Sequence, residues 1–438
     1  MLEEYIDEQA VIEKLQECIA IRSIKGEAEP GMPYGREVNR ALAYTLDLAA
    51  EMGFRTVNID GHVGYAEYGE GAEMIAVLSH LDIVPEGDGW TYPPFEGRIV
   101  DGKIYGRGTT DDKGPLIASL FALKALKDSG SQLKRRIRVI FGTDEESGSH
   151  DMIRYKETEE LPVMAFTPDA DYPVIFSEKT LVNLRLTKHL AKEPSQWNLS
   201  VAKGGSVVNQ VPDSGQMTLC KGGDTIEFAA KGVAAHGSTP EIGENAIDNL
   251  IQKFTQHPCF AESGKKLEAF ADFYMDHLFA GADGSGFGVN CNDSELGDVT
   301  INVGLLSGDG EKIQLTLDCR FPTLMDIEKC LQKIRAVCQK ALIQMEVTKN
   351  KPGVYVPKDH PLVKILQRVY EEETGERCEP LAIGGGTYAK ALPNTVAFGP
   401  IFPGRQNRIH ESDEYITVEE LMKNVQIITR AMYELAAD

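Results

Sequence analysis

The feature of this sequence that most constrains its fold is a change of hydrophobic pattern along the chain. In the first part, short apolar runs alternate with amphipathic helical stretches, which is typical of parallel strands joined by helical crossovers. In the middle, single apolar and polar residues alternate, as they do in half-exposed antiparallel strands. The first pattern then returns. We therefore predict an α/β domain with a mixed, mostly parallel sheet, formed by residues 1–181 and 352–438, and an inserted α+β domain, residues 182–351.

The same patterns predict the individual elements. Helices are expected near residues 3–24, 36–52 and 116–129, and buried parallel strands at 74–79, 137–141 and 163–166. In the middle, antiparallel strands are expected in LVNLRLTKHL, QMTLCKG, DTIEFAAKG, VTINVGLL and IQLTLDCRF, with helices in ENAIDNLIQKFTQ and MDIEKCLQKIRAVCQKAL. Near the end, a helix should follow Asp359, TVAFGP should form a strand, and a capping box from Thr417 to Glu420 should open the last helix.

Composition excludes several classes of partner. A net charge of -22 repels the phosphates of nucleic acids and anionic lipid surfaces. No apolar run approaches the roughly 18 to 20 residues needed to cross a bilayer, and the acidic first residues do not resemble a secretory signal, so we expect a cytoplasmic protein. The eight cysteines show no CxxC spacing and are expected to be reduced thiols. Any metal must therefore be held by histidines and carboxylates.

Polar residues follow four of the predicted strands. MIAVLS leads into His80 and Asp82, IRVIF into a TDEES segment, VMAF into Asp169, and TVAFGP into a loop that reaches His410. In open parallel sheets, ligands bind just beyond the carboxyl ends of strands. Each segment also has an ordinary structural explanation by itself, such as a hydrogen-bonded pair, a capping box, an Asx turn or a surface histidine.

Taken together, these residues indicate a metal centre. Two histidines and three carboxylates are the ligands that a pair of zinc ions prefers. The segment GRGTTDDKGP offers a carboxylate that could bridge two ions, because its glycines permit a tight turn and Asp111 and Asp112 come just before a helix. By itself, this segment could equally be a simple acidic helix start.

Eight segments together resemble the family of di-zinc exopeptidases that includes bacterial dipeptidase V, aminoacylase, succinyl-diaminopimelate desuccinylase and glutamate carboxypeptidase. They occur in the family's order over nearly the whole chain. The segments are SHLDIVPEGDGW, GRGTTDDKGP, TDEESGS, TPDADYP, VAAHGSTPEIGENA, LDCRFP, GGGTYAKAL and the His410 loop.

The resemblance implies a role for each residue of the metal centre. Asp111 would bridge two metal ions, with His80 and Asp169 completing one site and Glu146 and His410 the other. Asp82 would hydrogen-bond the far nitrogen of His80 and fix its tautomer. Glu145 would be the general base, and the peptide bond between Asp111 and Asp112 would be cis. The expected cofactors are two Zn²⁺ per chain, with Mn²⁺ or Co²⁺ as alternatives.

The resemblance also implies that the inserted domain is a ferredoxin-like lid. His236 would reach over the cleft and stabilise the negative oxygen of the reaction intermediate. Asn209 and Arg320 would contact the substrate, Arg320 through a bidentate fork on a carboxylate. The large lid resembles the monomeric branch of the family, so we expect a monomer.

Three functions follow from this comparison. The Pro-Asp-Ala form at Asp169, the long GRGTTDDKGP segment and GGGTYAKAL favour dipeptidase V, and so hydrolysis of dipeptides with a free N-terminus. The alternative is a deacylase of N-acetyl- or N-succinyl-amino acids that uses the same metals. A binding protein without activity is the third, but it would have no use for Glu145 as an unligated carboxylate beside a metal.

Overall fold

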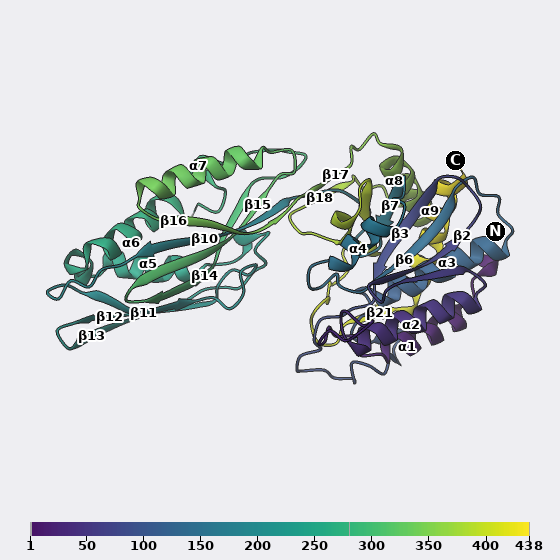
Figure 1. Cartoon of the computed structure of the whole chain (residues 1–438), viewed down its shortest axis with the longest axis horizontal. Coiled ribbons are helices and arrows are strands. Elements are labelled where there is room, and N and C mark those ends of the chain that lie inside the picture. Colours follow the sequence, from purple (N-terminus) through teal and green to yellow (C-terminus); the bar gives the residue numbers. More distant parts are fainter. Residues whose placement is uncertain (1, 280, 438) are drawn as a thin grey trace. The chain divides into compact units, whose positions relative to one another are not determined.

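The structure, a computed structural model, describes residues 2–279 and 281–437. The chain divides into two compact units. Unit 1 comprises Met1–Phe176, Val356–Leu381 and Thr387–Asp438, and unit 2 comprises Ser177–Tyr355 and Ala382–Gly386. Each unit has its own sheet and its own helices, and Figure 1 shows both.

Unit 1 is built on a mixed sheet in the order β1–β2–β6–β3–β7–β19–β9. Parallel pairing is confined to the four central strands, β6, β3, β7 and β19, and the outer strands run antiparallel. The strands are β1 (Arg55–Ile59), β2 (Val63–Tyr68), β3 (Met74–His80), β6 (Arg136–Gly142), β7 (Met164–Thr167), β9 (Val174–Glu178) and β19 (Thr395–Phe398). Strands β17 (Val354–Tyr355) and β18 (Leu381–Ile383) pair with β9 where the chain passes between the units.

Two small sheets complete the strands of unit 1. β8 (Ala170–Asp171) pairs with β20 (Pro400–Ile401), and β4 (Arg98–Val100) and β5 (Lys103–Tyr105) pair with β21 (Tyr415–Thr417). The helices are α1 (Glu8–Ile19), α2 (Arg36–Glu51), α3 (Lys113–Asp128), α4 (His150–Thr158), α8 (Pro361–Thr374) and α9 (Val418–Ala437), with short 3-10 helices at Glu3–Tyr5 and Tyr388–Ala391.

Burial explains why the central strands read as continuous apolar runs. Every residue of β3 is buried, because helices cover both faces of a parallel sheet. Helix α3 is likewise buried along most of its length, from Lys113 to Leu126. Among the described residues, no helix is both long and apolar enough to cross a membrane.

Unit 2 is an antiparallel sheet of seven strands in the order β13–β12–β11–β14–β15–β10–β16. Figure 1 shows its helices α5, α6 and α7 beside these strands. The strands are β10 (Thr180–His189), β11 (Asn198–Gly204), β12 (Ser214–Lys221), β13 (Asp224–Lys231), β14 (Thr300–Asp309), β15 (Lys312–Phe321) and β16 (Gln344–Lys351). The helices are α5 (Ala246–Gln256), α6 (Lys265–His277) and α7 (Ile327–Lys340), with 3-10 turns at Pro240–Ile242, Pro258–Glu262 and Ser285–Phe287.

The alternating pattern of unit 2 reflects a sheet with only one buried face. In β10 the buried and less buried residues alternate strictly, and the buried Val182, Leu184 and Leu186 join a core with α5, α6 and α7. The fold class predicted from the sequence is therefore confirmed: a mixed α/β unit and a separate unit with an antiparallel sheet and helices.

Local predictions succeed where caps are visible in the sequence. The capping box is confirmed, because the Glu420 amide donates to Thr417 Oγ1 and the Thr417 amide donates to the Glu420 carboxylate, both at 3.0 Å. The single helix predicted at 3–24 is wrong, because the 3-10 helix Glu3–Tyr5 is followed by a separate helix, α1. Asp7 caps α1 by accepting the Ala10 amide. Helix α8 is capped by the His360 ring and not by Asp359.

Candidate metal centre

The sheet of unit 1 gathers the predicted ligands at one edge. His80 is the last residue of β3 and lies opposite Gly142, the last residue of β6, in parallel register. β7 pairs with β3 on its other side in parallel, so Glu146 and Asp169 follow the two strands that flank β3 and lie at the same edge of the sheet. Asp111 precedes α3, and His410 lies in the loop between β20 and β21.

These five residues form two groups that share Asp111. In the first, His80 Nε2 lies 2.9 Å from Asp111 Oδ1 and 3.8 Å from Asp169 Oδ2. In the second, His410 Nε2 lies 2.9 Å from Asp111 Oδ2 and 3.2 Å from Glu146 Oε1. In each group the potential ligand atoms lie within 4.8 Å of one another. Asp111 thus turns one carboxylate oxygen to each group.

The residues present fit a pair of divalent cations. His80 Nε2 is completely buried and has no partner with hydrogen-bond geometry, although Asp111 Oδ1 is 2.9 Å away. Atoms that approach closely without hydrogen bonding are what the ligands of one ion look like. Imidazole nitrogens with carboxylate oxygens suit zinc, and also manganese or cobalt. The peptide bond between Asp111 and Asp112 is cis, which confirms that prediction.

Burial and the close packing of carboxylates and imidazoles shift the pKa values of this site. Desolvation, followed by the charge of Asp111, raises the pKa of Asp169 to about 6. Desolvation opposes protonation of His410, but hydrogen bonds to Asp111 and Glu146 outweigh it and raise its pKa to about 10. Desolvation also opposes protonation of His80, but the nearby carboxylates of Asp111, Asp169 and Asp82 outweigh it and raise the pKa of His80 well above its ordinary value. Protons and metal ions therefore compete for the same lone pairs.

Glu145 stands beside the ligand Glu146 but makes no side-chain hydrogen bond within the described residues. Its side chain is only partly buried. Desolvation, followed by the charge of Asp169, raises the pKa of Glu145 well above its ordinary value. A carboxyl group with a raised pKa beside a metal-type ligand cluster is able to accept and return a proton.

Asp82 contacts both His80 and the turn that carries Glu145 and Glu146. His80 Nδ1 lies 2.9 Å from the backbone carbonyl oxygen of Asp82, whereas the Asp82 carboxylate is 3.5 Å away. That carboxylate instead accepts the backbone N–H groups of Glu145 and Glu146, each at 3.1 Å. The carbonyl group is thus the nearer partner that can set the His80 tautomer, and the carboxylate holds the turn that carries the Glu145–Glu146 pair.

Two further residues hold the same turn and were not predicted to do so. The buried Asp151 carboxylate accepts the backbone N–H groups of Thr143 at 2.7 Å and Asp144 at 3.3 Å. It also accepts the hydroxyl of Tyr388, whose ring lies edge-on to that of His80 with centroids 6.0 Å apart. GGGTYAKAL marks the segment of Tyr388, but no spacing in it indicates Asp151 as a partner.

Unit 2 brings two of the predicted lid residues onto paired segments. Gln210 and His236 form an antiparallel bridge, and the Gly237 amide donates to the Asn209 carbonyl at 2.7 Å. His236 Nδ1 lies 2.6 Å from Ser238 Oγ and accepts the Ser238 amide at 3.4 Å; with Nδ1 as the acceptor, the proton of a neutral ring is on Nε2. Burial, followed by the charge of Arg320, lowers the pKa of His236 and favours this neutral form. His236 is thus a neutral hydrogen-bond donor.

Arg320 is more constrained than the sequence indicates. Its side chain is 3% exposed, and its Nε and Nη2 donate to Asp318 Oδ2 at 3.1 and 2.8 Å. Nη1 donates to the carbonyl oxygen of Gly384 at 2.6 Å. The Nε–Nη2 edge of the guanidinium, one of its two bidentate edges, is therefore already occupied. Only the remaining N–H groups are available for a ligand.

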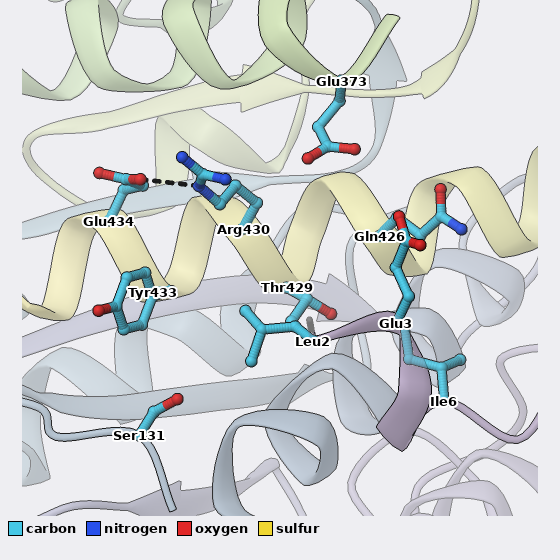
Figure 2. Close-up of a pocket in the computed structure, with 10 residues that line it drawn as sticks. All are labelled: Leu2, Glu3, Ile6, Ser131, Glu373, Gln426, Thr429, Arg430, Tyr433 and Glu434. Carbon is cyan, nitrogen blue, oxygen red and sulfur yellow. Dashed lines mark hydrogen bonds and ion pairs between the residues drawn. The ribbon is translucent and has the colours of Figure 1, made fainter. Parts of the chain in front are cut away.

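A cavity of about 450 Å³ lies elsewhere in unit 1, between the N-terminal segment and α9 (Figure 2). Leu2 and Ile6 line it together with Arg430, whose guanidinium is paired with Glu434 at 2.7 Å and with Glu372 at 3.2 Å. None of the candidate metal ligands lines this cavity, and the charge of Arg430 is already neutralised by the two glutamates. The candidate catalytic site is therefore the group of residues at the edge of the sheet, not this cavity.

Two candidate ligand groups that share a carboxylate at the edge of such a sheet are typical of a metal-dependent hydrolase, and the matches to known proteins identify the chain as a metallopeptidase. The chain belongs to the peptidase family M20/M25/M40, whose sequence model matches residues 76–434. It is 36% identical to "Putative dipeptidase YtjP" of Bacillus subtilis (strain 168), over 97% of each chain.

Solved structures share the fold. The aminoacylhistidine dipeptidase from Vibrio alginolyticus aligns with a TM-score of 0.63 at 16% identity, over 97% of this chain and 96% of that one. Human carnosine dipeptidase 1 aligns with a TM-score of 0.60 at 16% identity, over 99% and 98%. At these identities, the likeness shows the fold alone.

Proposed function

We propose that this protein is a dipeptidase that hydrolyses the amide bond of dipeptides with a free N-terminus. The observation that carries the proposal is the pair of candidate ligand groups joined by Asp111, with Glu145 next to Glu146 and its side chain free of hydrogen bonds within the described residues. The "dipeptidase" in the name of the Bacillus subtilis relative supports the choice of substrate.

His80, Asp111 and Asp169 would hold one divalent cation, and Asp111, Glu146 and His410 the other. When bound, such ions supply Lewis acidity and lower the pKa of a coordinated water molecule to about 7. We propose Zn²⁺ as the native ion, with Mn²⁺ or Co²⁺ able to replace it.

Glu145 would take the proton of the attacking water and later return it to the leaving amine. Its raised pKa suits both steps, because burial and the charge of Asp169 make this carboxyl group hold a proton more readily than an ordinary glutamate does. The Asp82 carboxylate supports this role, since it holds the backbone N–H groups of Glu145 and Glu146.

The residues of unit 2 would act on the substrate as the lid. His236, neutral and protonated on Nε2, would donate to the oxygen that becomes negative in the tetrahedral intermediate. Asn209, exposed next to His236 on the paired segment, would hydrogen-bond the substrate. Arg320 would contact the substrate carboxylate through the N–H groups that Asp318 and Gly384 leave free.

Substitution of Glu145 tests the assignment. Glu145→Gln keeps the size of the side chain and removes the titratable proton, so kcat should fall by about 10²- to 10⁴-fold while two metal ions per chain are retained. Glu157→Gln, at an exposed glutamate of α4, is the matched control and should leave kcat unchanged. Activity of Glu145→Gln equal to that of the unaltered protein would remove Glu145 from this role.

A substrate comparison separates the dipeptidase from the deacylase. Purified protein loaded with Zn²⁺ or Mn²⁺ is assayed with β-alanyl-histidine and with an N-acetyl- and an N-succinyl-amino acid. A dipeptidase needs a free amino group and should prefer β-alanyl-histidine in kcat/KM. Preference for the blocked substrates would establish the deacylase instead.

A further inference from the structure

A buried glutamate, Glu414, accepts an unusual number of hydrogen bonds from one loop. Its Oε1 accepts the backbone N–H groups of Gly108 at 3.1 Å, Thr110 at 2.9 Å and Asp111 at 3.2 Å. Its Oε2 accepts the Gly108 amide at 3.1 Å and Arg107 Nη1 at 2.7 Å. Three backbone N–H groups within four residues thus converge on one carboxylate, as they do in an anion-binding nest.

This loop ends at the residue assigned to bridge the metals. Asp111 must hold its carboxylate between His80 and His410, and the direction of its side chain depends on the backbone from Gly108 onward. Gly108 adopts a positive φ of 91°, and its amide donates to both carboxylate oxygens of Glu414. The loop is therefore folded around Glu414.

Glu414 also lies close in sequence to His410, which contacts the second carboxylate oxygen of Asp111. It follows His410 by four residues and directly precedes β21, whose Tyr415 pairs with Tyr105 of β5. The backbone supports the same link, because the Gly106 amide donates to the Glu414 carbonyl oxygen at 3.0 Å. One residue thus connects the loop of Asp111 with the loop of His410.

We propose that Glu414 is a positioning residue that preorganises the bridging carboxylate: it fixes the 107–111 loop so that Asp111 faces both metal sites at once. This inference rests on the ligand assignment in the proposed function. Arg107 neutralises Glu414 in a pair in which both side chains are 1% exposed, so this buried anion is balanced without a metal ion. Glu414 would act on the metals only through the shape of the loop.

Two substitutions of Glu414 separate the effect of its reach into the loop from the effect of its negative charge. Glu414→Gln keeps the size of the side chain, but its NH₂ group would face Arg107 and the Gly108 amide, donor against donor. Glu414→Asp keeps the charge and withdraws the carboxylate by one methylene from the loop. Glu411→Gln is the control, because it removes one negative charge from an exposed side chain of the same segment.

The readout is metal binding rather than activity. Chelator-treated protein is titrated with Zn²⁺ and with Mn²⁺ by calorimetry, and EPR spectroscopy of the doubly loaded Mn²⁺ form reports the exchange coupling that a shared carboxylate transmits. We expect both Glu414 variants to bind metal about 10- to 100-fold more weakly and to lose coupling, the range typical for residues that orient ligands. Glu411→Gln should bind as the unaltered protein does.

Each outcome decides the matter. Unchanged affinity and coupling in Glu414→Asp would overturn the proposal, as would an equal loss in Glu411→Gln. Circular dichroism checks folding, and if Glu414→Gln does not fold, Glu414→Asp alone decides. If neither variant folds, Glu414 serves the fold as a whole and the local role is wrong. Failure to hydrolyse dipeptides would refute the proposed function without affecting this result.

Discussion

Replacing Tyr388 by phenylalanine should destabilise unit 1 more at pH 8 than at pH 5. The Tyr388 hydroxyl donates to Asp151, whose carboxylate is fully buried. Burial raises the pKa of Asp151 to about 6, and the Tyr388 hydrogen bond opposes that rise. The carboxyl group is therefore ionised in the folded protein at pH 8 and mostly protonated at pH 5.

The direction of this pH dependence follows from the linkage between protonation of Asp151 and the free energy of unfolding. Because the folded pKa of Asp151 lies above the ordinary value of 3.8, the free energy of unfolding decreases as the pH rises from about 4 to about 6. Removing the Tyr388 donor raises that pKa further and extends the decrease to higher pH. A hydrogen bond to a charged acceptor contributes about 1.5 to 3 kcal/mol and a neutral one about 0.5 to 1.5 kcal/mol. The expected losses are thus about 1.5 to 3 kcal/mol at pH 8 and about 0.5 to 1.5 kcal/mol at pH 5.

Urea unfolding followed by circular dichroism measures both values, with a chelator present to keep metal binding out of the comparison. Tyr172→Phe is the matched control: its buried hydroxyl donates to the neutral amide oxygen of Asn424 at 2.8 Å. That variant should lose about 0.5 to 1.5 kcal/mol at both pH values. Equal losses for Tyr388→Phe at pH 5 and pH 8 would refute the reasoning.

Two further outcomes are expected. His410→Ala should leave one metal ion per chain after desalting, because only Asp111 and Glu146 of the second group remain; metal analysis that still finds two ions would remove His410 from the ligand set. In unit 2, burial raises the pKa of Asp248 to about 6 although Tyr274 donates to it at 2.6 Å. The difference from 3.8 corresponds to about 3 kcal/mol at most, so Asp248→Asn should increase the free energy of unfolding at pH 8 by roughly 1 to 3 kcal/mol. Urea unfolding at pH 8 checks this, and a less stable variant would contradict it.

Sequence alone determined the fold class and the candidate ligands of the metal centre. The buried strand 74–80 is a continuous apolar run, and β10 alternates apolar with polar residues, because each pattern records how many faces of its sheet are covered. The candidate ligands His80, Glu146 and Asp169 were visible for a related reason, since polar residues directly after buried strands must share one edge of a parallel sheet.

Only the tertiary structure decided which groups hold these residues in place. Glu414 lies about 300 residues from the loop that it fixes, and Asp151 and Tyr388 are 237 residues apart. Neither pairing leaves a periodicity in the sequence. Glu414 accepts backbone N–H groups, which place no requirement on the side chains of that loop, and the bond between Tyr388 and Asp151 joins only two single positions. The same holds for Arg320, whose Nε and Nη2 donate to Asp318 while its Nη1 donates to a carbonyl group brought from Gly384. Hydrophobic pattern is local, whereas the satisfaction of buried polar groups is a property of the folded chain.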